Sequence, residues 1–201
     1  MNETTCSDTY KSVSGPSSGV YRELSSKFIS LAYPVTSEDE AKEIIKSIKK
    51  EYFDARHHCF AYRIGAEGKV WRVGDDGEPS SSAGRPILGQ ILSNELSDIL
   101  IVVVRYFGGT KLGIPGLIRS YKSAAADAIS NSVIITKTAT EPVKISFDYE
   151  NTEPVMKFIK STGLQIAEEN FDLRCSLTLQ VRVSEVENVR KLLSEINGVD
   201  L

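Results

Sequence analysis

The sequence is poor in cysteine, with Cys6, Cys59 and Cys175 the only three in 201 residues. They are odd in number, lie more than fifty residues apart and include no Cys-x-x-Cys pair. Neither a disulfide framework nor a zinc site built from cysteines is therefore expected. Such sparse cysteine usage is typical of a reducing compartment, and we predict a cytoplasmic protein.

Long hydrophobic runs are also missing. The longest uninterrupted aliphatic run covers residues 99–104, far short of the roughly 20 residues that a membrane-spanning helix needs. The first twenty residues contain no basic segment followed by an apolar one, so they do not resemble a secretory signal. We predict no membrane association, and we interpret residues 1–20 as a polar N-terminal lead-in.

The chain lacks a strong excess of either charge. Its formal net charge is −3, and its 41% hydrophobic and 25% charged residues are ordinary for a globular protein. Residues 1–140 contain 17 Lys and Arg against 16 Asp and Glu, whereas residues 141–201 contain 7 against 11. A site for a polyanion would therefore be a local patch in the first part, and the acidic second part could offer a surface to a protein partner.

Hydrophobic periodicity predicts alternating strands and helices in the first part. A strand is expected over residues 24–35, and the capping box from Ser37 to Glu40 predicts the start of a helix. Residues 57–64 alternate in the manner of a strand, which would point His57 and His58 to opposite faces. A short helix follows over residues 86–92. The six aliphatic residues 99–104 predict a central strand buried on both faces, and residues 117–129 carry a helical stripe.

A second domain is predicted after a linker at residues 136–141. Strands are expected over residues 143–149, 164–171, 174–183 and 199–201, and helices over residues 152–162 and 184–197. This βαββαβ order is that of a ferredoxin-like domain. The domain boundaries predicted from the sequence are 21–138 and 142–201, and the fold class is α+β.

The glycine-rich loop over residues 105–116 is the strongest candidate site. It follows the central strand and precedes a helix, so its amides could bind an anion with help from Arg105 and Lys111. It contains neither a P-loop nor a dinucleotide-binding glycine pattern. The alternative interpretation is that Gly108 and Gly109 only allow a tight turn and close packing.

Two further clusters invite a chemical interpretation. Asp75, Asp76 and Glu78 lie on a long polar loop that could bind a cation or form a solvated turn, and their spacing is not that of a calcium loop. His58 and Cys59 are neighbours on an alternating strand, so they would face opposite sides and could not share a metal or act as a nucleophile and base. We predict no metal site, and we interpret Cys59 as a small buried residue.

These stretches together resemble the IMPACT/YigZ family. The resemblance rests on residues 55–62, on 75–84 and above all on 104–117, and it covers roughly residues 25–135 together with the appended small domain. Near the first strand the typical Lys-Ser-Arg-Phe is replaced by Ser25-Ser-Lys-Phe28, so only Lys27 keeps the basic charge. The residues that match the family's motifs are Arg56, His57, His58, Asp75, Asp76, Glu78, Gly84, Arg105, Tyr106, Gly108, Gly109, Leu112 and Gly113.

The resemblance implies both a fold and a setting. The first domain is expected to be similar to the second domain of ribosomal protein S-five, with helices on a mostly antiparallel four-stranded sheet. The second is expected to be similar to the last domain of elongation factor G. Eukaryotic relatives regulate translation under amino-acid starvation, but they carry a different additional domain. The family supplies no catalytic residue and no cofactor to transfer to this chain.

The leading hypothesis is therefore a translation-associated regulator that binds RNA or the ribosome without catalysis. Tyr106 and Phe107 would be positioned to stack an unpaired base, with packing in the core as the alternative role. One alternative is an enzyme for a small anionic metabolite, with His57 and a carboxylate of the acidic loop as acid and base. Another is a protein-interaction module. The residues predicted to contact nucleic acid or another anion are Arg56, His57, Arg105, Gly108, Gly109, Lys111 and Arg119.

Overall fold

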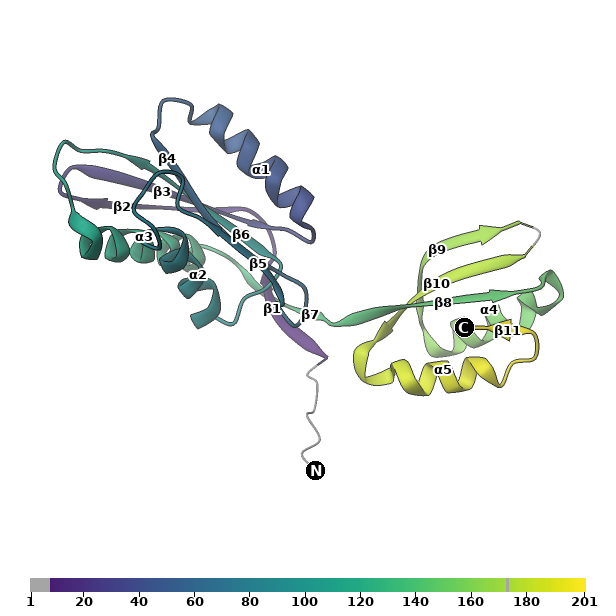
Figure 1. The fold of residues 1–201 in the computed structure, drawn as a ribbon. Coiled ribbons are helices and arrows are strands. Elements are labelled where there is room, and N and C mark those ends of the chain that lie inside the picture. Colours follow the sequence, from purple (N-terminus) through teal and green to yellow (C-terminus); the bar gives the residue numbers. More distant parts are fainter. Residues whose placement is uncertain (1–7, 173) are drawn as a thin grey trace. The chain divides into compact units, whose positions relative to one another are not determined.

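The computed structural model describes residues 8–172 and 174–201. The chain divides into an N-terminal unit, Tyr10–Lys137, and a C-terminal unit that comprises Thr138–Leu201 with Asp8 and Thr9. Each unit combines helices with an antiparallel sheet, as Figure 1 shows. The predicted α+β class is confirmed.

The N-terminal unit is built on a five-stranded sheet. Its order is β2 (Ser17–Glu23), β3 (Ser26–Pro34), β6 (Ile99–Tyr106), β4 (His57–Ile64) and β5 (Val70–Gly74), with every neighbouring pair antiparallel. The six aliphatic residues that begin β6 are fully buried and the strand lies in the middle, as predicted. The sheet has one strand more than the four that the resemblance implied.

Helices cover both faces of this sheet (Figure 1). Helix α1 (Glu38–Glu51) packs on one face, and helices α2 (Gly84–Ser93) and α3 (Gly113–Ser130) pack on the other. Alternation along β4 supplies both cores, because Cys59 lies on the α2 and α3 side whereas Tyr62 lies on the α1 side. His57 and His58 consequently point apart, as predicted.

Helix α1 begins at the predicted capping box. The hydroxyl of Ser37 accepts a hydrogen bond from the Glu40 amide at 3.2 Å. The Glu40 carboxylate accepts from the amide of Thr36 at 2.8 Å. The reciprocal bond therefore reaches one residue further back than the usual capping box does.

Two sequence predictions near the boundaries of the N-terminal unit are wrong. Strand β1 (Thr9–Val13) and the start of strand β2 occupy most of residues 8–20 of the lead-in expected at residues 1–20, and residues 1–7 lie outside the described part. The expected linker at 136–141 is occupied by β7 (Ile134–Thr138), which pairs with β1, and by the start of the next strand. Both segments are polar strands at sheet margins, so they lack the apolar alternation by which a strand is recognised.

The C-terminal unit has the predicted ferredoxin-like order. Its sheet runs β11 (Val199–Asp200), β8 (Thr140–Phe147), β10 (Cys175–Arg182) and β9 (Gln165–Phe171), with all pairs antiparallel. A separate hydrophobic core lies between this sheet and helices α4 (Thr152–Thr162) and α5 (Val186–Ser194). The helical segments of this unit are η1 (Tyr149–Asn151), α4 (Thr152–Thr162), η2 (Val183–Glu185) and α5 (Val186–Ser194).

Helix α4 has the predicted bounds and ends at Gly163 in the left-handed conformation, with φ 69°. Helix α5 is shorter than the predicted 184–197 and has no side-chain cap. The Ser184 hydroxyl, shortly before this helix, donates to the carboxylate of Asp8. The backbone amide of Ser184 donates to the same carboxylate at 2.8 Å.

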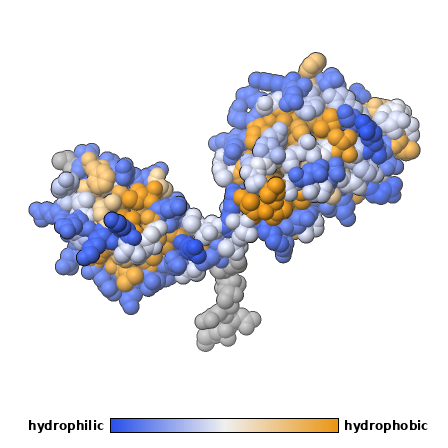
Figure 2. All heavy atoms as spheres, turned by 180° about the vertical axis from the view of Figure 1, so that it is seen from behind, coloured by the Kyte–Doolittle hydropathy of each residue, from blue (hydrophilic) through white to orange (hydrophobic). Residues whose placement is uncertain are grey.

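Figure 2 shows apolar patches separated by hydrophilic side chains on the visible surface of each unit. Exposed aromatic residues include Phe53, Trp71 and Phe107 in the N-terminal unit. Among the residues described, no helix is both long enough and apolar enough to cross a membrane.

Candidate functional site

The candidate site begins with a row of three side chains across the end of the sheet. Phe28 on β3 and His57 on β4 both lie opposite Arg105 on β6. Antiparallel register places the three on the face covered by α2 and α3. The acidic loop and the glycine-rich loop extend from this end of the sheet, so the topology brings together both loops that the sequence singled out.

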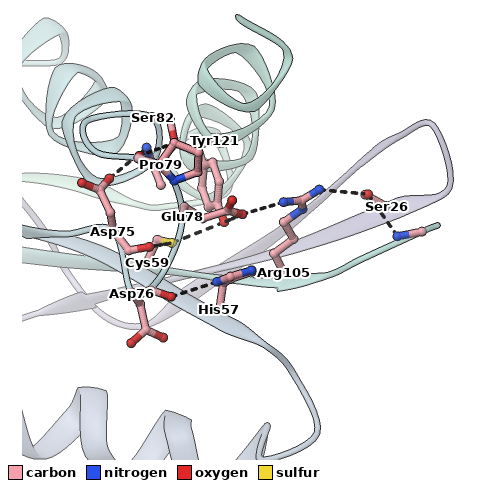
Figure 3. Close-up of polar contacts among 12 residues, drawn as sticks. Ser26, His57, Cys59, Asp75, Asp76, Glu78, Pro79, Ser82, Arg105 and Tyr121 are labelled. Atoms are coloured by element: carbon pink, nitrogen blue, oxygen red, sulfur yellow. Dashed lines mark hydrogen bonds and ion pairs between the residues drawn. The ribbon is translucent and has the colours of Figure 1, made fainter. Parts of the chain in front are cut away.

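Arg105 is buried and ion-paired. Its Nη1 lies 2.6 Å from Oε1 of Glu78, and the two side chains are 6% and 4% exposed (Figure 3). The guanidinium carbon lies 5.4 Å from the ring centroid of Phe28 and 5.6 Å from that of Phe107, so two aromatic rings also hold it. Arg105, predicted from the sequence to contact an anion, therefore already has a carboxylate partner within the protein. The acidic loop supplies a partner for the cation and covers it.

Tyr121 and Cys59 extend the polar contacts of Glu78 into the core. The Tyr121 hydroxyl donates to Oε1 of Glu78 at 2.8 Å, and Sγ of Cys59 lies 3.3 Å from that hydroxyl and 3.0 Å from the carbonyl oxygen of Asp75. Burial raises the pKa of Tyr121 and that of Cys59, with smaller contributions from their neighbours. Tyr121 is therefore held as a neutral donor, and Cys59 is a buried thiol, as predicted.

Asp75 connects the acidic loop to the beginning of α2. Its carboxylate accepts hydrogen bonds from the amides of Ser81 at 2.8 Å, Ala83 at 3.0 Å and Gly84 at 2.8 Å. These contacts satisfy amides that the helix itself leaves without partners and place a negative charge at its N-terminus. Asp75 is thus a helix-capping residue, although it lies nine positions before the helix begins.

Asp76 fixes the loop to β4 and α1. Its carboxylate accepts from the backbone amide of His58 at 2.7 Å and from Nζ of Lys49 at 2.7 Å. Burial opposes the ionised form of Asp76, but these two donors outweigh it and lower the pKa of that carboxyl. The carbonyl oxygen of Asp76 accepts from Nδ1 of His57 at 2.8 Å, and His58 uses Nε2 to donate to the carbonyl oxygen of Tyr52 at 3.0 Å.

Close packing accounts for part of the glycine-rich loop. A Cβ added to Gly108 would come within 2.1 to 2.3 Å of the backbone of Ser25 and Ser26, so only glycine fits there. The amide of Gly108 donates to the hydroxyl of Ser26 at 3.2 Å. Gly109 has φ +87°, which a residue with a side chain rarely adopts. Close packing therefore accounts for Gly108, and the conformation of the turn accounts for Gly109.

The remainder of this loop forms an uncapped helix N-terminus. Leu112 is the N-cap of α3 and provides no side-chain hydrogen bond, and the first turn contains no acidic residue. The start of the helix lines a pocket of about 240 Å³, whose charged members are Glu78, Arg105 and Lys111. Exposed amides and an unopposed helix dipole at such an end favour a bound anion.

One further atom at the pocket lacks a partner. Among the described residues, Nε of Arg105 is one of three buried side-chain polar atoms with no hydrogen-bond partner. A buried N–H group without an acceptor is costly, and it is commonly satisfied by water or a ligand. Arg105 lines the same pocket as the first residues of α3, so this donor lies beside the start of the helix.

The remaining predicted site residues do not line the pocket. Arg56 and Arg119 are exposed, and His57 is half-buried against the acidic loop. Tyr106 lies on the α1 side, where its hydroxyl donates to Asp54 at 2.8 Å. Its predicted stacking role at this site is therefore wrong, because neighbouring strand residues face opposite ways.

Sequence reasoning did not identify several contributors to the site. Ser26, Phe28 and Tyr121 surround Arg105 and Glu78 from β3 and α3. No sequence spacing connects them to the motifs, although Tyr121 belongs to the predicted apolar stripe of α3. Among residues 8–172 and 174–201, no three His, Cys, Asp or Glu side chains are grouped so as to hold a metal ion.

Comparison with known proteins assigns the chain to a family. Residues 24–129 match the family described as the Impact N-terminal domain. IMPACT family member YvyE of Bacillus subtilis is 31% identical over 173 residues, covering 86% of this chain and 80% of that protein. The chain belongs to the IMPACT family. IMPACT family member YigZ of Escherichia coli is 28% identical and covers 86% of this chain and 85% of that protein.

One solved structure is similar to almost the whole chain. A crystal structure described as that of a hypothetical protein superposes with a TM-score of 0.77 at 26% identity, covering 94% of this chain and 93% of the other. A structure described as the two-domain translational regulator Yih1 is 23% identical and covers 61% of this chain, with a TM-score of 0.37.

Proposed function

We propose that the protein is a cytoplasmic, translation-associated regulator that binds RNA, free or in the ribosome, at the N-terminus of α3. The observation that carries the proposal is the uncapped start of this helix, which lines a pocket together with Lys111 and with the unpartnered Nε of Arg105. Helix amides, a lysine and an arginine N–H are donors that suit a phosphate oxygen.

Family membership supports the translational setting. The resemblance drawn from the motifs implies likenesses to a ribosomal protein and to an elongation factor, and both of those proteins work on the ribosome. The acidic loop supports a role in binding rather than in acid–base chemistry. Asp75, Asp76 and Glu78 each have partners within the unit, at a helix start, at β4 with α1 and at Arg105 respectively.

The phosphate contacts make salt dependence the natural test. We expect the purified protein to bind ribosomes and a labelled structured RNA with an affinity that falls steeply between about 50 and 200 mM salt. Replacing Lys111 by Gln removes one cation from the pocket. It should weaken binding several-fold and reduce the slope of log K against log salt concentration by about 1.

Lys50→Gln provides the matched control. Lys50 is an exposed lysine of α1, on the opposite face of the sheet. Arg105→Ala is unsuitable, because it would leave the carboxylate of Glu78 buried without its cation, at a cost of about 3–5 kcal/mol. Equal salt slopes for the Lys111 and Lys50 variants would exclude α3 as the RNA site. No binding of either ribosomes or RNA at low salt would reject the function and favour the acidic C-terminal unit as a protein-binding surface.

A further inference from the structure

The pocket at the start of α3 has an extensive apolar wall in addition to the charged groups that could bind an anion. Its other walls are apolar, and the side chains of Phe107 and Ile114 remain 49% and 53% exposed. Leu112 and Leu117 complete this wall. Apolar area left in contact with water next to polar groups is typical of a ligand site, because covering it is favourable. A volume of about 240 Å³ suits one flat ring system rather than a drug-sized molecule.

The carboxylate of Glu78 determines which polar groups this ring would carry. Its Oε1 accepts from Nη1 of Arg105 and from the hydroxyl of Tyr121, so two donors fix the position of the carboxylate. A carboxylate has about four acceptor sites, and two therefore remain for other donors. Glu78 lines the pocket, so a ring that enters it would be recognised by N–H groups.

The charges around the pocket favour an anionic ligand over a cationic one. Arg105 and Lys111 contribute two positive charges against the single negative charge of Glu78, and the dipole of α3 adds a partial positive charge. This excess of positive charge would repel a lysine or arginine side chain from a partner protein. The ligand that fits has an anionic group, a flat apolar face and N–H donors at the edge of its ring, which is the chemistry of a nucleotide.

We propose that the pocket holds one unpaired nucleotide of the bound RNA, with its base against Phe107 and Ile114. The N–H edge of the base donates to Glu78, and its phosphate lies at the amides of α3 beside Lys111. This inference rests on the proposed function and specifies the part of the RNA that the site takes. Guanine suits the site best, because its Watson–Crick edge carries two neighbouring N–H donors.

A paired base cannot occupy this site. In a duplex both its faces are stacked and its donor edge is used by the opposite strand, so the base must first leave the helix. The pocket therefore selects single strands, bulges and loops over continuous duplex. Aromatic stacking of this kind contributes about tenfold in affinity for each base.

The experiment compares three labelled RNAs by fluorescence anisotropy at one salt concentration. They are a ten-nucleotide oligouridine with one central guanosine, the same strand with an abasic site at that position, and the guanosine strand annealed to its complement. The guanosine strand should bind about tenfold more tightly than the abasic strand and more tightly than the duplex. Phe107→Ala should abolish the preference for the guanosine strand over the abasic strand.

Phe53→Ala is the matched control, since Phe53 is 82% exposed and follows α1. It should retain the full preference. Ile114→Ser tests the same wall through a second exposed residue, and Glu78→Gln tests the edge contact once its fold has been checked by circular dichroism. Equal binding of the guanosine and abasic strands by the unmodified protein would overturn the inference that the pocket holds a base. The proposed RNA-binding function would still be supported in that case. Failure of all three RNAs to bind would overturn the proposed function, and this inference with it.

Discussion

At the scale of single residues, Arg105 is the charged side chain around which the candidate site is built. Arg105 follows a buried strand and precedes glycines, a position typical of a phosphate-binding cation. Its principal partner is Glu78, 27 positions earlier, and the pair is almost completely buried. Sequence spacing cannot reveal such a partner, because the contact depends on how the loop after β5 folds over the end of β6. The residues that remain predictable from the motif are those on the open side of the pocket, Lys111 above all.

Asp98 is a second buried charge, and we expect it to stabilise the margin of the N-terminal unit. Its carboxylate accepts hydrogen bonds from Tyr10 at 2.6 Å, Lys137 at 3.0 Å and the Gly65 amide at 2.8 Å. These contacts join β1, β7 and the turn after β4 to the start of β6. Asp98→Asn should lower the free energy of unfolding at pH 7 by about 1–3 kcal/mol. Urea unfolding checks this value.

The same carboxylate predicts a dependence on pH. Burial would raise the pKa of Asp98, but its three donors outweigh burial and hold the pKa below its usual value. A lowered pKa in the folded protein means that the stabilisation is complete above the unfolded value and is lost as the pH falls below about 4. The difference in stability between the unmodified protein and Asp98→Asn should therefore shrink from pH 5 to pH 3. Asp39→Asn on the exposed face of α1 should show little difference at either pH. A difference in stability between the unmodified protein and Asp98→Asn that stays constant from pH 5 to pH 3 would contradict this explanation.

At the scale of elements, the hairpin between β2 and β3 is notable for its turn. Leu24 and Ser25 have φ values of 43° and 64°, and the flanking residues Glu23 and Ser26 are paired. Two left-handed residues in a two-residue turn are typical of a type I′ hairpin, for which Asn-Gly is preferred. A branched side chain such as Leu is unfavourable in this conformation. This strained turn lies against Gly108 of the glycine-rich loop.

Replacing Leu24 by Asn and Ser25 by Gly should therefore stabilise the N-terminal unit. The gain is expected to be about 1 kcal/mol, since both new residues adopt the left-handed region at lower cost. The denaturation midpoint should rise with no change in the m-value. Leu24→Ala is the control, because it removes the exposed apolar side chain while keeping a residue that is disfavoured in this conformation. An equal gain from Leu24→Ala would show that apolar exposure, and not the backbone, is responsible.

Elements with strong apolar patterns were predictable from the sequence, and those without them were not. The six aliphatic residues of β6 and the stripe of α3 correctly indicated a central strand and its covering helix, and the bounds of α4 agree with the prediction. Strands β1 and β2 were missed because they are polar and only partly buried. Only part of the pocket could be predicted from the sequence. Its backbone donors follow from the order of strand, glycines and helix, whereas Glu78 enters from a loop that sequence alone leaves unplaced.

At the scale of the whole molecule, the two units have separate hydrophobic cores. The C-terminal core lies between one sheet and two helices, and it includes Leu177 at 1% exposure. The N-terminal unit has a core on each face of its sheet, with Ile101 fully buried in one of them. A unit of about 60 residues buries a smaller fraction of its surface than a unit twice that size, so it is less stable for each residue.

We therefore expect the units to unfold in two steps, with the C-terminal unit first. Leu177→Ala should lower the stability of that step by about 2–5 kcal/mol through loss of buried contacts and the cavity left behind. The only tryptophan, Trp71, lies on β5, so tryptophan fluorescence follows the N-terminal unit alone, whereas far-ultraviolet circular dichroism follows both. Leu177→Ala should shift the first circular dichroism transition to lower denaturant and leave the fluorescence midpoint unchanged. Ile101→Val should do the reverse. A fluorescence midpoint that shifts with Leu177→Ala as far as the circular dichroism midpoint would mean that the two cores unfold as one cooperative structure.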